Sequence, residues 1–565
     1  MDEASYLATL HALWQRHWPA GIPDEPVYPH GKRPITHYLR AWARQQPDKP
    51  AVVFYGHTLS YGELDRLSDR FAALLAERGI GPGDRVSVFM PNCPQFHIAF
   101  FGILKRGAIY APMSPLSKAF ELHHQLTDPG AVSLVALDQL MPVVREVKPQ
   151  CALREVFVTS FADVLPAEPA LPLPDLLRAP RVACPDAIDL LPALAACTAP
   201  TPGVEIGWDD VAALNYTGGT TGLPKGCIHT HGHIAYTAAS ATRTSAYMTS
   251  DTVALCFLPE FWIAGQNLGL TFPTFAGGTL VLMARWDPVA FMAAVQRYRV
   301  DSTAILVDGI DEVLNHPRLH EFDLRSLQHA RSISFIKKLN PDYRRRWREV
   351  TGATLCEASW GMTETNTSDT FTTGFQDDDF DLKQQPIFAG LPVPGTEFKV
   401  CDFATGELLP LGEEGELCVR SPAVLAGYWR QPEATARAIR DGWLHTGDAA
   451  ILDTEGFLHF LGRRKEMLKV NGMAVFPAEI EALLGQHPAL QGSAVVGRPD
   501  PKTGERAVAF VLVKPEARGT LDEAAVSAWC AERISVHKVP EVRFVDALPM
   551  TATGKVRKDE LAKQL

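Results

Sequence analysis

Residues 216–226 read YTGGTTGLPKG, a stretch that is rich in glycine and threonine and contains a single lysine. Glycines adopt positive φ and carry no Cβ, so their backbone N–H groups can surround an anion. The threonine hydroxyls and the Lys225 ammonium add donors and positive charge. The apolar run at 211–214 predicts a strand that leads into this loop. The stretch therefore predicts a phosphate-binding loop at the end of a strand.

This loop differs from the P-loop of the NTPases, which requires the pattern G-x-x-x-x-G-K-[ST]. Here the lysine follows Pro224 and precedes Gly226. We expect a different loop with the same ligand. Its candidate phosphate-binding residues are Thr217, Gly218, Gly219, Thr220, Thr221, Gly222 and Lys225.

The composition describes a large folded protein. A chain of 565 residues that is 46% hydrophobic can form a large core and more than one domain. The net charge of -11 comes without a long basic block, which argues against nucleic-acid binding. The densest basic cluster, 344–346, is predicted to be a solvated helix face. The 10 cysteines form no C-x-x-C pair, which argues against zinc and a disulfide framework and favours the cytoplasm.

The sequence predicts no signal peptide and no transmembrane segment. Asp2 and Glu3 stand where a signal peptide would be cationic. The longest apolar stretch, 253–283, is broken by proline, glycine and polar residues, whereas a spanning helix needs about 20 apolar residues. A stripe at helical spacing is expected to pack on the body of the protein, with peripheral membrane contact as the alternative. The stripe consists of Leu7, Leu10, Trp14 and Trp18.

Strand and helix patterns alternate through the first part of the chain. Apolar strand patterns lie at 51–54, 85–90, 110–113, 132–137 and 155–159, and helix patterns lie at 61–78 and 96–105. This alternation predicts an α/β fold with a largely parallel sheet. Residues 160–208 are rich in proline and alanine and are predicted to form a solvent-exposed connection.

Further motifs follow the loop in a fixed order. They are WGMTET at 360–365, GWLHTGD at 442–448, GRRKE at 462–466, VNGM at 470–473 and PMTATGKVRK at 549–558. With the loop, they resemble the adenylate-forming superfamily, in particular its acyl-CoA synthetase (fatty-acid–CoA ligase) branch, from about 35 to 561. The resemblance implies a large N-terminal domain of mixed and parallel sheets with helices, residues 1–462. It also implies a small mobile α+β C-terminal lid domain, residues 463–565.

The resemblance implies roles for the motif at 360–365. Trp360 would stack on adenine, Thr363 would bind the α-phosphate, and Glu364 would hold Mg²⁺. Each role suits the residue type, because an aromatic plane can stack on a purine and Mg²⁺ prefers oxygen ligands from carboxylates and phosphates.

The later motifs carry the remaining implied roles. Asp448 would accept the ribose hydroxyls and Arg463 would contact the same ribose. Lys465 would be the hinge between the domains, since domain closure needs a few residues that absorb large backbone changes. In the family the segment around Gly472 borders the pantetheine tunnel, which favours CoA as acceptor, and Lys555 is the catalytic lysine.

The acyl pocket is where this chain departs from the family pattern. Trp262 stands where a histidine is usual, and with Phe261 it would line or gate a hydrophobic pocket; the alternative is a core tryptophan. Phe335 and Ile336 stand where small residues usually line the adenine and acyl pockets. Asp308 replaces a usual proline. These departures leave the identity of the acid open. They do not affect the residues expected to bind the phosphates.

Two other patterns could bind metal. His229, His231 and His233 would share one face of a strand, and ordinary packing is favoured over a metal site. Asp377, Asp378, Asp379 and Asp381 are predicted to be a solvated acidic loop.

The predicted function is an ATP-dependent acyl-CoA ligase. It would activate a carboxylic acid, expected to be a medium- to long-chain fatty acid, as acyl-AMP with release of pyrophosphate, and pass the acyl group to CoA. ATP, Mg²⁺ and CoA are the implied cofactors, and the chain would act as a monomer or homodimer. The alternatives are an aryl or alicyclic acid, a carrier protein as acceptor, adenylate oxidation as in luciferases, and a non-catalytic acyl or nucleotide sensor.

Overall fold

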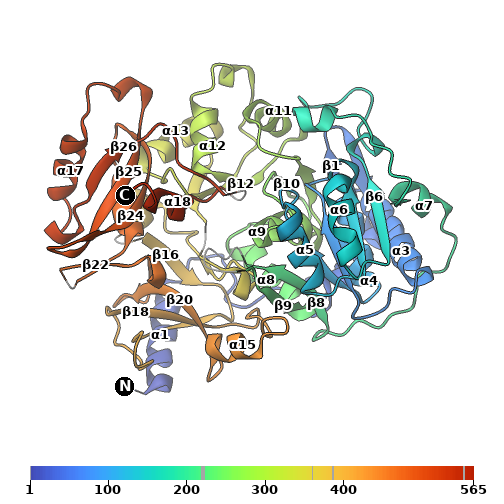
Figure 1. Cartoon of the computed structure of the whole chain (residues 1–565), viewed down its shortest axis with the longest axis horizontal. Helices are drawn as coiled ribbons and strands as arrows, with labels where there is room; N and C mark the ends of the chain where they lie inside the picture. The colour runs from blue at the N-terminus through green and yellow to red at the C-terminus, as the bar shows by residue number, and fades with distance from the viewer. Residues whose placement is uncertain (1, 218–222, 359, 385–386, 472, 552–553) are drawn as a thin grey trace.

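The computed structural model describes residues 2–217, 223–358, 360–384, 387–471, 473–551 and 554–565. Two largely parallel sheets form most of the N-terminal part (Figure 1). The first has the strand order β7-β6-β5-β3-β4-β8-β9, and only its β8–β9 pair is antiparallel among the described strands. Its strands are β3 (Arg85–Phe89), β4 (Ile109–Pro112), β5 (Ser133–Leu137), β6 (Glu155–Thr159), β7 (Ile188–Asp189), β8 (Val211–Tyr216) and β9 (Gly226–Thr230).

The second sheet has the order β14-β13-β12-β10-β11-β1-β2, with β1 and β2 antiparallel at one edge. Its strands are β1 (Pro50–Phe54), β2 (His57–Ser60), β10 (Val253–Cys256), β11 (Thr279–Leu282), β12 (Ser302–Leu306), β13 (His329–Ile333) and β14 (Thr354–Glu357). The apolar strand patterns place continuous buried runs here, as a sheet covered on both faces requires.

Helices cover both sheets and fill the space between them. The helix α4 (Pro94–Lys105) contacts β1 of the second sheet and β3 and β4 of the first, and all its residues are buried. The helix α3 (Tyr61–Glu77) begins at a capping box of Ser60 and Glu63. The other helices before β15 are α1 (Glu3–His17), α2 (Ile35–Gln45), α5 (Ala119–Thr127), α6 (Met141–Val147), α7 (Leu190–Ala196), α8 (His231–Thr244), α9 (Ile263–Gly265), α10 (Phe272–Ala276), α11 (Pro288–Tyr298), α12 (Val307–Leu314) and α13 (Pro341–Thr351).

A third, antiparallel sheet has the order β15-β16-β21-β20-β18-β17, with β19 paired to β20. Helix α1 packs on it through Leu7, Leu10 and Trp14, and the Trp14 Nε1 donates to the Gly456 carbonyl at 2.8 Å. The packing predicted for this stripe is confirmed. The elements of this region are β15 (Thr370–Phe371), α14 (Phe380–Lys383), β16 (Ile387–Pro392), β17 (Glu397–Cys401), β18 (Glu414–Arg420), α15 (Pro432–Ala438), β19 (Ile439–Arg440), β20 (Trp443–Leu452) and β21 (Leu458–Arg463).

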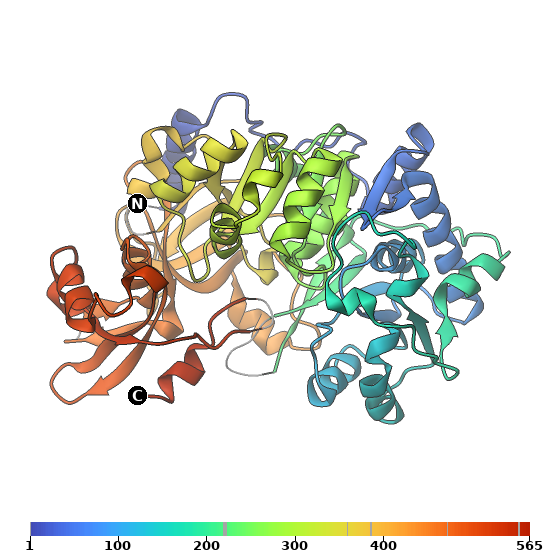
Figure 2. The ribbon, with the colours of Figure 1, turned by 90° about the horizontal axis from the view of Figure 1, so that it is seen from above.

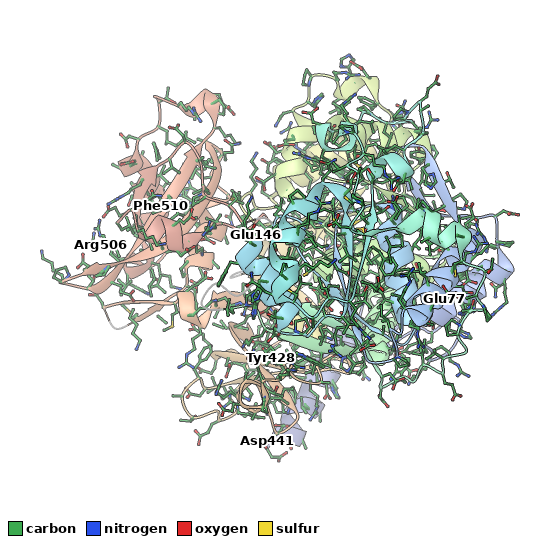
Figure 3. The ribbon with its side chains drawn as sticks, turned by 45° about the vertical axis from the view of Figure 1, so that its right-hand side comes forward. Glu77, Glu146, Tyr428, Asp441, Arg506 and Phe510 are labelled. Atoms are coloured by element: carbon green, nitrogen blue, oxygen red, sulfur yellow. The ribbon has the colours of Figure 1, made fainter. Side chains whose placement is uncertain are left out.

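The last sheet is formed by the C-terminal part and has its own core. Its order is β23-β22-β25-β24, with β26 parallel to β25. It lies apart from the two parallel sheets, as Figures 2 and 3 show, with Phe510 and Arg506 on one side of the molecule and Glu77 of α3 on the other. Its elements are β22 (Leu468–Val470), β23 (Met473–Val475), α16 (Pro477–Leu484), β24 (Leu490–Asp500), β25 (Gly504–Val513), α17 (Glu523–Ala531), β26 (Glu541–Phe544) and α18 (Lys558–Ala562).

The predicted α/β fold with a large N-terminal and a small C-terminal domain is confirmed, whereas the connection at 160–208 was predicted wrongly. Leu190 and Leu194 of α7 are fully buried in the main core, and β7 extends the first sheet. The proline and alanine residues in this segment concealed its short helix, LLPALAA, in the sequence. Within the described residues, no helix is both long and apolar enough to cross a membrane.

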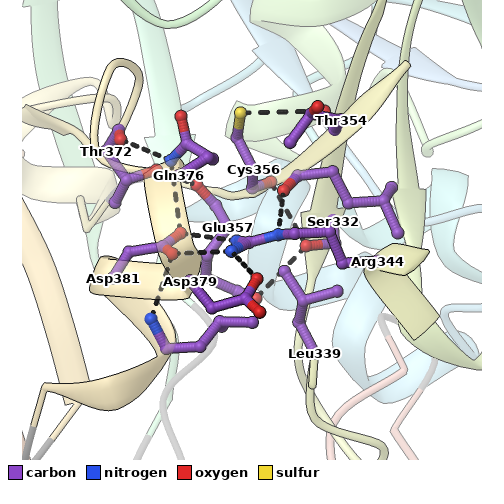
Figure 4. A network of polar contacts seen from close by, with 12 residues as sticks. Ser332, Leu339, Arg344, Thr354, Cys356, Glu357, Thr372, Gln376, Asp379 and Asp381 are labelled. Atoms are coloured by element: carbon purple, nitrogen blue, oxygen red, sulfur yellow. Dashed lines mark hydrogen bonds and ion pairs between the residues drawn. The ribbon is translucent and has the colours of Figure 1, made fainter. Parts of the chain in front are cut away.

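The two predictions of solvated charge were wrong for the members that pair inward, whereas Arg345 and Asp378 are exposed as predicted. Arg344 and Asp381 are 1% and 5% exposed and pair through both oxygens of the carboxylate, at 2.8 and 2.6 Å. Asp379 accepts a further bond from Arg344, and Figure 4 shows the guanidinium between the two carboxylates. The basic and acidic runs each contain one member that turns inward to neutralise the other.

The three histidines do not share a strand face. Strand β9 ends at Thr230, whose Oγ1 accepts from the His233 N–H, and α8 begins at His231. Because Thr230 is a favoured helix N-cap, the chain turns from strand to helix in the middle of the pattern.

Candidate active site

The candidate phosphate-binding loop joins two antiparallel strands. Tyr216 pairs with Gly226, and the next pair is closed by the Thr217 N–H, which donates to the Lys225 carbonyl at 3.0 Å. The Lys225 N–H returns a bond of 3.3 Å to Thr217 Oγ1. The strand predicted before the loop is confirmed. The candidate residues Gly218, Gly219, Thr220, Thr221 and Gly222 lie outside the described residues.

Tyr428 joins the lysine of this loop to the candidate metal carboxylate. The Lys225 Nζ lies 4.2 Å from the centre of the Tyr428 ring, and the phenol donates to Glu364 Oε1 at 2.8 Å. Burial and the nearby Glu364 raise the pKa of Tyr428, so it remains a donor at neutral pH. Tyr428 thus contacts both the candidate phosphate ligand, Lys225, through its ring and the candidate metal ligand, Glu364, through its hydroxyl.

Thr363 is positioned by a buried histidine. A carbonyl only accepts, so the His229 Nε2 donates to the Thr363 oxygen, at 2.8 Å. Burial, reinforced by the charge of His233, lowers the pKa of His229 to about 3, which keeps the ring neutral. The next residues, Asn366, Thr367 and Ser368, all have positive φ between 56° and 64°. Consecutive non-glycine residues in this region store strain that a site accepts to fix its geometry.

Asp448 holds two donors at the opposite end of the site. Its Oδ2 accepts from the Trp360 Nε1 at 3.0 Å, and its Oδ1 lies 2.7 Å from the Arg463 Nε. Burial raises the pKa of Asp448 to about 6, against the opposing effect of Arg463. Trp360 also meets Phe398 edge to face, with ring centroids 6.0 Å apart.

A buried carboxylate fixes the turn that carries Asp448. Glu416 accepts from the Gly447 N–H at 3.1 Å and pairs with the His445 Nδ1 at 2.9 Å. The Thr446 hydroxyl donates to the Leu417 carbonyl at 2.8 Å and accepts from the Asp448 N–H at 3.0 Å. The motif at 442–448 is therefore anchored to β18 on one side and presents Asp448 on the other.

Lys555 reaches the site from the C-terminal part of the chain. Its Nζ lies 5.9 Å from the ring centres of both Trp262 and Phe335, and these rings lie 6.1 Å from each other. Although the residue as a whole is exposed, desolvation of its ammonium lowers its pKa, and the charge of Arg463 lowers it further. The structure thus brings together residues 262, 335, 463 and 555, which are far apart in sequence.

Lys465 lies where the chain leaves the third sheet and enters the C-terminal one. It sits in a single turn, Arg464–Glu466, between β21 and β22. The following Glu466 pairs with Lys558 at 3.0 Å, and Lys558 also pairs with Glu481 at 2.8 Å. This links the turn to the helix that follows Lys555. Gly472 lies outside the described residues.

The four expected pocket residues lie in three different places. Trp262 and Phe335 face each other beside Lys555, while Phe261 packs at the border of the main core. Ile336, expected beside Phe335, instead packs with the C-terminal core residues Ala494, Val496, Val508, Phe510, Leu548 and Leu561.

Some residues of the site could not be predicted. Tyr428 and His229 act on Glu364 and Thr363 from far away in the chain, and neither carried a charge or spacing that pointed to this role. Glu357 is another: burial raises its pKa to about 7, and it accepts from Ser334 Oγ at 2.7 Å. Only the fold brings these side chains together.

The residues present suit a bound nucleotide and a hard cation. The Glu364 carboxylate accepts from Tyr428 at one oxygen, and a carboxylate has further lone pairs for a metal. It lies beside Lys225 through the shared Tyr428, as a cation bridging phosphates would require. Each oxygen of the Asp448 carboxylate has a further lone pair, so this group can accept the hydroxyls of a ribose while it keeps its bond from Trp360.

Comparison with known proteins agrees with this geometry. Residues 39–429 match the family described as AMP-binding enzyme, and residues 479–555 match the AMP-binding enzyme C-terminal domain. A long-chain-fatty-acid–CoA ligase of Bacillus subtilis (strain 168) is 32% identical over 98% of this chain and 98% of its own. A feruloyl-CoA synthase of Amycolatopsis sp is 32% identical over 92% of this chain and 97% of its own.

Among solved structures, ATP-bound MatB from Rhodopseudomonas palustris superposes with a TM-score of 0.78 at 28% identity, covering 94% of this chain and 99% of its own. The predicted resemblance and the predicted class of enzyme, an ATP-dependent, AMP-forming acyl-CoA ligase, are confirmed. The chain belongs to the AMP-binding enzyme family.

Proposed function

We propose that this protein activates a medium- to long-chain fatty acid as acyl-AMP and transfers the acyl group to CoA. The observation that carries the proposal is the position of Lys555, whose ammonium lies beside a pair of aromatic rings and near the charges of Asp448 and Arg463. A cation there lies between a hydrophobic acid site and a nucleotide site. The similar fatty-acid ligase of Bacillus subtilis supports the choice of acid.

In the first step the carboxylate attacks the α-phosphorus of ATP and pyrophosphate leaves. Positioning and charge neutralisation account for most of the rate in such a reaction. Lys555 would neutralise the charge that develops between the attacking carboxylate and the α-phosphate, and Thr363 would donate to the same phosphate. Lys225 and the loop at 216–226 would hold the phosphates that leave.

Glu364 would hold Mg²⁺, which supplies positive charge to the phosphate oxygens when bound. Tyr428 orients that carboxylate through its hydrogen bond. Asp448 and Arg463 would bind the ribose. Trp360 would lie along the adenine, with its indole N–H directed at Asp448.

In the second step the CoA thiolate attacks the acyl carbon and AMP leaves. We propose that residues 463–565 form a lid that turns about Lys465, so that Lys555 leaves and the segment around Gly472 approaches. The location of Lys465 between β21 and β22 supports this division, because the turn that contains it joins two different sheets. The protein is proposed to work in the cytoplasm, as a monomer or homodimer.

An aryl acid is the second candidate. Trp262 and Phe335 meet at 47° beside Lys555, and flat rings of this kind can also hold an aromatic acid. The feruloyl-CoA synthase relative has the same 32% identity as the fatty-acid ligase.

The test measures pyrophosphate and AMP release with Mg-ATP for fatty acids of graded length and for benzoate, with and without CoA. CoA-dependent turnover that peaks at a medium or long chain is expected. A peak with benzoate would favour the aryl candidate. Pyrophosphate release that stalls after one turnover with CoA present would indicate a carrier protein, and ATP binding without turnover would indicate a sensor.

A further inference from the structure

Residues 335–338, with the sequence FIKK, form a short loop in which each side chain goes to a different partner. The loop is closed at its base, because Ser334 Oγ accepts from the Leu339 N–H at 3.0 Å and donates to Glu357. Lys338 then folds back, and its Nζ donates to the carbonyls of Ser334 and Phe335 at 3.2 and 3.0 Å. These contacts give the loop a fixed shape that presents its side chains.

Ile336 is the side chain that enters the C-terminal domain. It packs against the apolar cluster that includes Ala494 of β24 and Phe510 of β25. Opposite it stands Gly492 of β24, where an added Cβ would lie 2.3 Å from Ile336 Cγ2. The three atoms nearest to that Cβ all belong to Ile336. The glycine therefore leaves room for one side chain of the N-terminal domain in this arrangement.

A second contact repeats the pattern on helix α16. An added Cβ at Gly485 would lie 2.5 Å from Lys338 Cγ, so the stem of the lysine passes directly over the end of this helix. Glu481 of α16 contributes a favourable charge to Lys338. Ile336 and Lys338 thus each pack against a glycine of the C-terminal domain, which indicates that the two domain surfaces are complementary here.

The loop is also fixed to the N-terminal domain by charge. Lys337 is 6% exposed and pairs with Asp311 of α12, which also accepts from the Tyr343 hydroxyl at 2.9 Å. The unusual Asp308 accepts from the backbone N–H of Lys337 and attracts its charge. The two departures from the family pattern, at 308 and at 335–338, thus contact each other through Asp308 and Lys337.

Phe335 connects this docking to the acyl site. Its ring faces Trp262 and Lys555, and an added Cβ at Gly554 would lie 3.8 Å from Phe335 Cδ2. Phe335 faces the proposed acyl site, and the next residue, Ile336, enters the C-terminal domain. A movement of one is therefore passed directly to the other.

We propose that residues 335–338 are a docking element that selects the arrangement in which Lys555 faces the acyl site. Ile336 is a positioning residue that acts through Lys555, because its insertion opposite Gly492 holds the lid in the adenylate-forming arrangement. The inference rests on the proposed turn of residues 463–565 about Lys465. Release of Ile336 accompanies the movement of the lid toward the thioester-forming arrangement.

The test enlarges the residue on one side of the contact, Gly492, and then shortens the residue on the other side, Ile336. Gly492→Ala adds a methyl group whose three nearest atoms all belong to Ile336, at a position whose φ any residue accepts. Overpacking of this size is expected to reduce acid-dependent ATP–pyrophosphate exchange about 10- to 100-fold, while CoA transfer from supplied acyl-AMP changes by less than about threefold. Ile336→Ala with Gly492→Ala restores most of the exchange, since the truncated side chain makes room for the new methyl group.

Gly497→Ala is the matched control on the same strand. Its added Cβ would lie 2.5 Å from Leu468 Cδ2, inside the C-terminal domain, so Ile336→Ala should not rescue it. The rate of trypsin cleavage at Lys465 provides a readout that needs no turnover. This rate should be higher in Gly492→Ala than in the wild type, and it should return to the wild-type value in the double variant. Normal exchange in Gly492→Ala, or equal loss of both half-reactions without rescue, would overturn the proposal.

These measurements separate the inference from the proposed function. A wild-type protein without ligase activity on any acid would refute the proposed function, and the trypsin rates would still decide whether the docking exists. A wild-type ligase whose Gly492→Ala variant shows unchanged exchange and unchanged cleavage would refute the docking alone.

Discussion

The indole nitrogen of Trp360 and the carboxylate of Asp448 lie 3.0 Å apart, although 88 residues separate them in the sequence. The bond fixes the plane of the indole, because Phe398 holds the ring from a second direction at 80°. The proposed adenine-stacking surface and the proposed ribose ligand are therefore a single unit. An aromatic residue without a donor would keep the surface and lose this link.

Trp360→Phe tests the link. It keeps an aromatic face but removes the N–H, and hydrogen bonds to charged groups contribute about 1.5–3 kcal/mol, so ATP affinity should fall about tenfold or more. The measurement is calorimetric titration with ATP. Trp286→Phe is the control, since it removes an indole bond to the Glu312 carboxylate at 2.6 Å elsewhere. Equal effects of the two variants would contradict the role.

Asp448 predicts a pH dependence of nucleotide binding. Burial raises its pKa to about 6, so the group is protonated below that pH and cannot accept both ribose hydroxyls. ATP affinity should fall about tenfold between pH 7 and pH 5, in proportion to the ionised fraction. Asp448→Asn should bind weakly with a flat profile over this range, and a slope retained in that variant would assign the titration to another group.

The same group has the opposite effect on folding. Its folded pKa lies above the ordinary aspartate value, so its contribution to stability is fully present below pH 3.8 and is lost as pH rises through about 6. Thermal unfolding without nucleotide should therefore show that Asp448→Asn is at least as stable as the wild type at pH 8. A large loss of stability at that pH would mean that the ion pair with Arg463 outweighs burial.

The sequence predicted what depends on local pattern. The strand before the candidate phosphate loop follows from the run at 211–214. The end of α3 follows from Gly79, and the structure gives this residue a φ of +68°, which suits glycine. Arg344 shows the limit, because nothing in an RRR run tells which arginine meets a carboxylate 37 residues later. Ile336 shows another: a pocket position inferred from order along the chain cannot reveal which of two neighbours enters a second domain.

Tyr428→Phe tests the connection between the candidate phosphate loop and the carboxylate of Glu364, the candidate metal ligand. The ring remains under Lys225, but Glu364 loses its hydrogen bond of 2.8 Å. Loss of a bond to a carboxylate should raise the Mg²⁺ concentration required for half-maximal exchange about fivefold or more, with CoA transfer from acyl-AMP unchanged. A titration of ATP–pyrophosphate exchange with Mg²⁺ decides the point. Tyr236→Phe, which removes a phenol bond to the Pro394 carbonyl, serves as the control for general loss of stability.

Arg344 and Arg345 offer a comparison within one helix. Arg344→Ala leaves Asp381 buried without its partner and should lower the free energy of unfolding by about 3–5 kcal/mol. Arg345 is exposed and pairs only along the helix surface with Asp342 and Glu349, so Arg345→Ala should change it by about 0.5 kcal/mol or less. Urea denaturation followed by tryptophan fluorescence measures both, and similar midpoints would show that the buried pair contributes little.

Lys555→Ala is the decisive variant for the mechanism. Removal of a group that stabilises developing charge costs about 10²- to 10³-fold, so acid-dependent ATP–pyrophosphate exchange should fall by at least that factor. Thioester formation from supplied acyl-AMP should be nearly unchanged, because the proposed turn of the lid removes Lys555 from the site in that step. Lys555→Arg should recover only part of the exchange, since a planar guanidinium cannot reproduce the compact point charge that the ammonium places beside Trp262 and Phe335. Equal losses in both half-reactions would show that Lys555 serves a single fixed site and that residues 463–565 do not alternate between two positions.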